Sequence, residues 1–156
     1  MLSSWRSRAT VLTAVATMAV PVLGLAGPAG ASANAVPFKA SVSGTWTSPE
    51  EGLFIFAGTG NASHLGNITD NATQNLPISS IETLTAANGD TLTLSDTQCL
   101  ISSLSISVAE ITCVWSVTGG TGRFSGATGS GTLDMILVFS PNPSSFTETW
   151  TGSIAY

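Results

Sequence analysis

The chain has 156 residues, with nine acidic and four basic side chains and a formal net charge of −5 at pH 7. Two of the basic residues fall within the first ten positions, so only Lys39 and Arg123 remain beyond them. A chain with so few cations has no basic stripe with which to displace counterions from phosphates, and this excludes nucleic acid as a partner. The same sign of charge disfavours binding to anionic membrane surfaces.

The start of the chain has the pattern of an export signal. Two arginines precede the apolar, uncharged run VLTAVATMAVPVLGLA at residues 11–26, and small-residue cleavage sites follow around Ala33 and Ala35. A membrane anchor is the alternative, but prolines and glycines interrupt a run already shorter than the roughly 20 apolar residues of a span. We predict a signal peptide over residues 1–35, removed on secretion without membrane insertion, and one domain over residues 36–156.

The two cysteines of the chain, Cys99 and Cys113, both lie in the predicted mature domain. Exported proteins meet an oxidising compartment, where such a pair usually forms a disulfide. A zinc site is excluded, because two thiols without C-x-x-C spacing and the single, distant His64 do not supply four ligands. We therefore expect a disulfide, no bound metal and no cofactor.

Alternation of apolar and polar residues with period two dominates the domain, and no sustained helical period occurs. Near the mature start and at the C-terminus the alternation places large apolar residues on one face, in the segments 38–46 and 146–156. Asn88-Gly89-Asp90 between two alternating segments predicts a tight hairpin. With strands around residues 53–57 and 64–69, the chain has seven or eight short strands, which is typical of an antiparallel barrel or sandwich. Similar first and last strands favour a sheet that closes on itself.

Two further segments constrain the expected sheet. The apolar face changes from even positions, up to Val108, to odd positions, from Ile111 onward, so a bulge or turn is expected near Ala109-Glu110. The segment LDMILVF, residues 133–139, is apolar on both faces apart from Asp134. Such a strand is either covered on both sides or part of a subunit contact, so a homo-oligomer is possible.

The stretch TGGTGRFSGATGSGT, residues 118–132, has the spacing of neither a dinucleotide-binding loop nor a P-loop, and a strand follows it where both motifs need a helix. Together with GTGNASHLGNIT at 58–69 and ANGDTLTL at 87–94, it resembles the glycine turns of dirigent proteins and of allene oxide cyclase-like barrels, including secreted bacterial members. The resemblance implies an eight-stranded antiparallel barrel with an apolar cavity. It does not bring a reaction with it, because function depends on the site.

Three side chains are candidate catalytic residues. His64 is the only histidine, and its strand parity with Phe54 and Phe56 would point it into the barrel; a structural hydrogen bond is the alternative. Asp134 and Glu148 each interrupt a run of apolar residues on the same face. A carboxylate that faces a cavity has a raised pKa and can serve as an acid or anchor, whereas one that faces solvent or pairs with Arg123 has a structural role.

The leading hypothesis is a barrel that binds a small apolar molecule without covalent chemistry. The candidate ligand-binding residues are Phe38, Trp46, Phe54, Phe56, Trp115, Arg123 and Trp150. Arg123 would clamp a carboxylate on the ligand, or else form a structural ion pair. The alternatives are a cyclase, isomerase or dirigent-like stereo-directing protein acting on a lipid-derived or phenolic substrate, and a non-catalytic extracellular assembly protein.

Overall fold

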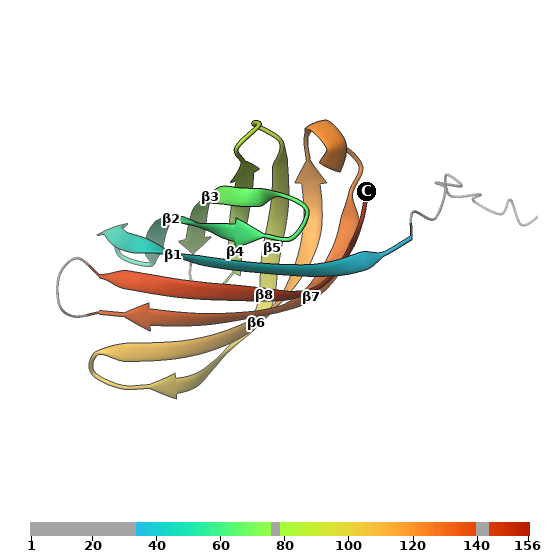
Figure 1. Ribbon diagram of the computed structural model, residues 1–156. Helices are drawn as coiled ribbons and strands as arrows, with labels where there is room; N and C mark the ends of the chain where they lie inside the picture. The colour runs from blue at the N-terminus through green and yellow to red at the C-terminus, as the bar shows by residue number, and fades with distance from the viewer. Residues whose placement is uncertain (1–33, 76–78, 140–143) are drawn as a thin grey trace, which may run out of the picture. The chain divides into compact units, whose positions relative to one another are not determined.

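The computed structural model describes residues 34–75, 79–139 and 144–156, and these form a closed antiparallel barrel in which each strand pairs with the next (Figure 1). The strands are β1 (Val36–Glu50), β2 (Leu53–Ala62), β3 (Gly66–Asn75), β4 (Ser79–Ala86), β5 (Thr91–Leu104), β6 (Val108–Gly120), β7 (Thr128–Val138) and β8 (Ser145–Ala155), with one short 3-10 helix, η1 (Gly122–Phe124). The predicted all-β barrel is confirmed. The predicted export signal lies outside the described residues, apart from its last two positions.

Pairing of the first strand with the last closes the barrel. Strand β1 runs antiparallel to β8 from the pair Val36 and Ile154 to the pair Thr45 and Ser145. Along both strands, side chains at alternate positions are buried, so one face of each strand lines the interior. The amphipathic pattern expected at the two ends of the domain is therefore what allows the sheet to close without free edges.

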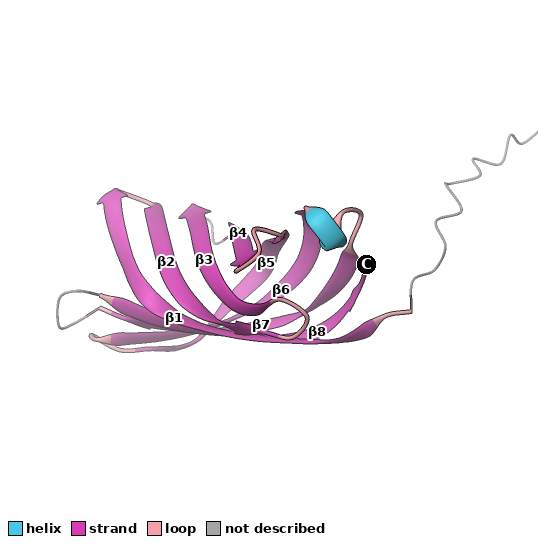
Figure 2. Cartoon of the chain, turned by 45° about the horizontal axis from the view of Figure 1, so that its top comes forward, coloured by secondary structure: helices cyan, strands magenta, loops and turns pink. Residues whose placement is uncertain are grey.

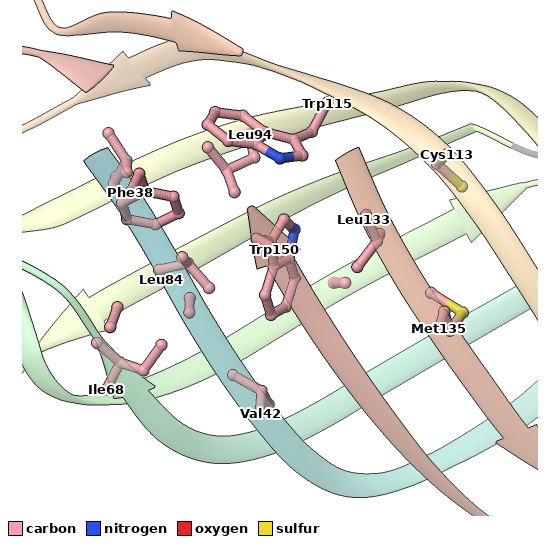
Figure 3. Close-up of a cluster of buried hydrophobic side chains, with 14 of the residues drawn as sticks. Phe38, Val42, Ile68, Leu84, Leu94, Cys113, Trp115, Leu133, Met135 and Trp150 are labelled. Atoms are coloured by element: carbon pink, nitrogen blue, oxygen red, sulfur yellow. The ribbon is translucent and has the colours of Figure 1, made fainter. Parts of the chain in front are cut away.

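Aromatic side chains from several strands fill the middle of the barrel. Trp115 and Trp150 are fully buried, and Phe38 packs edge-on against Trp115 with ring centroids 5.4 Å apart. Figure 3 shows these three rings together with Leu94 and Leu133, which come from different strands and converge on the interior. The interior at this level is a packed core, as small barrels require.

One end of the barrel is closed by loops. The β6–β7 connection carries η1, which is drawn in cyan in Figure 2, and Phe124 of η1 is completely buried. Arg123 links this loop to two others, because its guanidinium donates to the backbone carbonyl of His64 and lies 3.8 Å from a carboxylate oxygen of Asp90. Three connections are thereby held together over the end at which β1 begins.

The turns follow the sequence with two corrections. The Asn88-Gly89 hairpin joins β4 to β5 as predicted, with Gly89 at a φ of 88°. His64 does not begin a strand: it has a left-handed φ of 69° and lies in the turn between β2 and β3. The change of apolar parity occurs at the turn between Leu104 and Val108, a few residues before the predicted position, and Ala109 already faces inward.

The segment LDMILVF forms the second half of β7 and ends one residue beyond it, and within the described residues only one of its faces is covered. Leu133, Met135 and Leu137 are buried in the barrel, whereas Asp134 and Ile136 lie on the outer face. A subunit contact over this outer face stays a prediction. Among the described residues, no helix has the length and apolar character needed to cross a membrane.

Cys99 and Cys113 form the predicted disulfide between neighbouring strands β5 and β6. The bond lies at a β-bulge, where Gln98 has a left-handed φ of 53° and the register of β5 against β6 shifts. Antiparallel ladders lose pairing at a bulge, so the cross-link holds two strands together where their hydrogen bonding is interrupted.

Replacing both cysteines by serine is expected to lower the free energy of unfolding by about 3 kcal/mol, because the bond closes a loop of about 15 residues in the unfolded chain. Urea denaturation of the oxidised protein and of the Cys99→Ser/Cys113→Ser variant measures this difference. Reduction of the unaltered protein should give the same loss. A difference below about 1 kcal/mol would show that the bond does not restrict the unfolded chain as the loop-entropy argument requires.

Candidate functional site

Four carboxylates point into the barrel from four strands. Asp70 of β3, Glu82 of β4, Asp96 of β5 and Glu148 of β8 are each no more than 1% exposed. The strand pattern places them there, because each shares its face with apolar neighbours that the core requires, such as Leu92 and Leu94 on β5.

The four groups lie close together although β8 is not a neighbour of β3, β4 or β5. Oxygen atoms of Asp70, Glu82 and Glu148 all lie within 4.8 Å of one another. The hydroxyl of Ser80 donates a 2.6 Å hydrogen bond to Asp96 and also lies 3.2 Å from an oxygen of Glu82. The cluster therefore spans the interior from one wall of the barrel to another.

Burial raises the pKa of all four carboxyl groups. Desolvation, followed by the charge of Asp96, raises the pKa of Asp70 from 3.8 to about 7, while the backbone of Asn71 acts weakly in the opposite direction. Desolvation and then the neighbouring carboxylates hold the pKa values of Glu82 and Glu148 well above their ordinary range. The pKa of Asp96 is also raised by burial, against the effect of hydrogen bonds from Glu82 and Ser80. Near neutral pH the cluster therefore retains protons that exposed carboxyl groups release.

Several polar atoms of this region have no hydrogen-bond partner within the described residues. They are both carboxylate oxygens of Asp70 and of Glu148, one oxygen each of Glu82 and Asp96, and the indole nitrogen of Trp150. Native interiors pair more than about nine tenths of such groups, since an unpaired one costs about 1–3 kcal/mol. Because so many unpaired atoms lie in one interior region, we take this region as a candidate site.

An apolar cavity of about 140 Å³, the open-end cavity, lies at the end of the barrel opposite the end that the loops close. Its lining is aromatic and aliphatic with a single amide, and comprises Phe54, Gln74, Ile101, Leu104, Ala109, Ile111, Leu137 and Phe139. Gln74 also connects the cavity to the acidic cluster, because it shares the inner face of β3 with Asp70 and pairs across the strands with Ser80.

A larger hollow of about 460 Å³ lies on the outer side of β2, β3 and β4. Its lining includes the outward-facing Thr59, Asn61, Asn67 and Thr69, and it contains no charged side chain. Water competes with any ligand for exposed hydroxyl and amide groups, so this hollow offers little affinity. The apolar open-end cavity is therefore the better candidate site.

The predicted ligand-binding residues fall into three groups. Phe54 lines the open-end cavity, and Trp46 packs against its wall, 5.6 Å from Phe54 and 5.7 Å from Phe139 between ring centroids. Four others, Phe38, Phe56, Trp115 and Trp150, are packed in the core at 2% exposure or less. Arg123 lies at the closed end, where it forms the structural ion pair with Asp90 that the sequence left as an alternative.

Of the three candidate catalytic residues, the barrel encloses only Glu148. His64 is exposed in its turn, where its ring nitrogen lies 3.0 Å from the carbonyl oxygen of Pro37, so it does not point inward. Asp134 is exposed on the outer face of β7 and accepts a 3.0 Å hydrogen bond from Thr112. Neither residue contributes to the acidic cluster.

Sequence reasoning missed Asp70, Glu82 and Asp96. The signal for Asp96 was present, because it follows Leu92 and Leu94 at the same parity in TLTLSD. The signal for Glu82 was ambiguous, since Ile81 on the opposite face is also apolar yet is 52% exposed.

Comparisons with known proteins add one structural similarity. The sequence matches no protein-family model and no curated protein. Among solved structures, the chain is similar to the pterocarpan synthase dirigent protein GePTS1, with 16% sequence identity and a TM-score of 0.42, over 93% of this chain and 99% of that chain.

Proposed function

We propose that this barrel binds a small, largely apolar molecule at its open end and holds a hydrogen-bonding group of that molecule beside Gln74. The observation that carries the proposal is the apolar cavity, which adjoins a buried polar cluster in the interior. A cavity of about 150 Å³ lined by apolar side chains is known to accept benzene, so about 140 Å³ suits one ring or an equivalent branched group. The disulfide favours an oxidising compartment, and we propose that the protein acts after export.

Trp46 provides a reporter for this binding, because its ring touches two aromatic residues of the cavity wall. Titration with toluene, phenol and p-cresol is expected to change the tryptophan emission of the protein in a saturable way. Phenol and p-cresol should bind more tightly than toluene, since their hydroxyl group can hydrogen-bond to the Gln74 amide.

The variant Ala109→Phe fills the cavity and should weaken binding of all three compounds at least about tenfold, because the ring of the new side chain takes the place of the ligand. The matched control is Val114→Phe, which adds the same ring on the outer face of the same strand, where Val114 is 41% exposed. The proposal would be overturned if none of the three compounds changed the tryptophan emission of the unaltered protein, or if both variants bound them with equal affinity.

A second function, acid–base catalysis on the bound molecule, is favoured by the pKa of Asp70. Burial raises this pKa to about 7, where a group both donates and accepts protons readily at neutral pH. The candidate reactions are cyclisation, isomerisation or stereo-directed coupling of a lipid-derived or phenolic substrate. Loss of turnover in Asp70→Asn, with ligand affinity retained, would support catalysis; unchanged turnover would remove it.

A further inference from the structure

Among the described residues, no positively charged side chain lies in the barrel interior beside the acidic cluster. Beyond the predicted signal, the basic side chains are Lys39 and Arg123, and both are exposed. The single histidine, His64, is exposed as well. Carboxylates that are buried without a counter-charge must hold protons or bind a cation, because an isolated buried charge is very costly.

The arrangement of oxygen atoms suits a cation. Asp70, Glu82 and Glu148 each offer one carboxylate oxygen, and these three atoms lie within 4.8 Å of one another. Five of the six carboxylate oxygens of these residues have no hydrogen-bond partner within the described residues, and the three side chains are 0–1% exposed. These unpaired acceptors converge from β3, β4 and β8, so they are not the by-product of one strand's sequence.

The donor set and the spacing select the class of metal. All donors are carboxylate oxygens, and both cysteines are consumed in the disulfide, so soft metals that prefer sulfur or imidazole are disfavoured. Calcium binds oxygen atoms at about 2.3–2.6 Å, which places opposite ligands up to about 5 Å apart. Magnesium requires about 2.0–2.1 Å and near-ideal octahedral geometry, whereas calcium accepts irregular sets of oxygen ligands, which suits three carboxylates held on separate strands.

In contrast to the expectation from the sequence that no metal is bound, we propose that Asp70, Glu82 and Glu148 form an interior binding site for a divalent cation of the calcium class. The adjacent Asp96, which is held by Ser80, adds negative charge to the site. The metal and protons compete for the same oxygens, so the raised pKa values of these carboxyl groups make metal binding weaker at acidic pH. This site shares no residue with the lining of the ligand cavity, so binding of a cation and binding of an apolar molecule are tested separately. The acid–base role proposed for Asp70 requires a metal-free cluster, because a carboxylate that ligates a cation does not carry a proton.

Terbium provides a direct probe, because it takes the place of calcium in oxygen sites and emits when a nearby tryptophan is excited. Trp150 is two residues from Glu148 on the same face of β8. The folded protein, freed of metal with a chelator that is then removed, is titrated with terbium at slightly alkaline pH. We expect sensitised emission that saturates near one equivalent, is displaced by calcium and falls at least about tenfold in mildly acidic buffer.

Two variants locate the site, and one serves as a control. Glu148→Gln and Asp70→Asn keep the shape of the side chain and remove a charged ligand, and each should weaken terbium binding at least about tenfold. Asp134→Asn removes an exposed acid from the outer face and should leave terbium binding unchanged.

The melting temperature gives an independent readout, because a cation that binds only the folded chain stabilises it. Calcium should raise the melting temperature of the unaltered protein and of Asp134→Asn, but not that of Glu148→Gln. Absence of both sensitised emission and a calcium-dependent shift in the unaltered protein would overturn the proposal. Terbium binding that both Glu148→Gln and Asp70→Asn leave intact would overturn it as well.

Discussion

The melting temperature of the metal-free protein, held in a chelator, is expected to fall by on the order of 10 °C between about pH 5 and about pH 8. The folded chain retains protons on the buried carboxyl groups that the unfolded chain releases near ordinary pKa values. Stability falls with pH wherever the folded state binds more protons, so stability contributed by the protonated cluster is lost as pH rises through the folded pKa values.

Asp70 sets the scale of this effect. Its pKa moves from 3.8 to about 7, so the loss begins near the first value and is complete above the second. Between about pH 5 and pH 8 this group alone accounts for roughly 3 kcal/mol, or about 10 °C for a domain of this size. Burial also raises the pKa values of Glu82 and Glu148 well above their ordinary range, so these two groups add to the loss as pH rises.

Calorimetry across this range, with two variants, tests the assignment. Asp70→Asn should flatten the dependence, because the amide has no proton to lose, whereas Asp134→Asn on the outer face should follow the unaltered protein. A melting temperature that is constant or rises over the same range would mean that the interior carboxyl groups are ionised in the folded state, contrary to their burial.

Gly152→Ala is expected to destabilise the barrel by roughly 3 kcal/mol or more, which is the upper range for overpacking a core. Gly152 of β8 pairs with Gly131 of β7, and a Cβ atom at this position would lie 2.6 Å from a ring carbon of Trp115 and still closer to the carbonyl oxygen of Ser130. The indole of Trp115 is held in place, because it is fully buried and its nitrogen donates hydrogen bonds to two backbone carbonyl oxygens, at 3.0 and 3.2 Å.

Gly119→Ala is the matched control for this substitution. The nearest atom to a Cβ at Gly119 is the Cβ of Thr93 at 3.9 Å, an ordinary contact, and the effect on stability should stay within about 0.5 kcal/mol. Urea denaturation of both variants measures the contrast. Equal losses, or a stable Gly152→Ala protein, would show that the close approach of β7, β8 and Trp115 is not needed for folding.

Much of the fold could be predicted from local patterns. Alternation at 38–46 and 146–156 indicated two similar strands, and these are the pair that closes the sheet. The Asn88-Gly89 turn and the disulfide followed from local chemistry in the same way. The strands and the turn depend on residues that are adjacent in sequence, and the disulfide joins the two cysteines of the chain, which have no other cysteine to pair with.

The site was harder to predict, because it depends on which face of each strand turns inward. On β7 both faces are apolar, so the sequence did not decide whether Asp134 or Leu133 faces the core. On β3 the inward face carries Ile68 and Ala72 beside Asp70, a weak apolar signal. Register around the whole barrel settles these choices, and it brings together carboxylates that lie as far apart in sequence as Asp70 and Glu148.

The ladder between β1 and β8 determines where the barrel can be attached to something else. Val36 and Ile154 are paired beside the loops that Arg123 ties together, and Tyr156 packs against Phe124 at 4.9 Å between ring centroids. Fusion partners, affinity tags or surface linkers joined after Tyr156 are therefore attached at the closed end of the barrel. A barrel immobilised in this way presents to the solution the end that carries the apolar cavity.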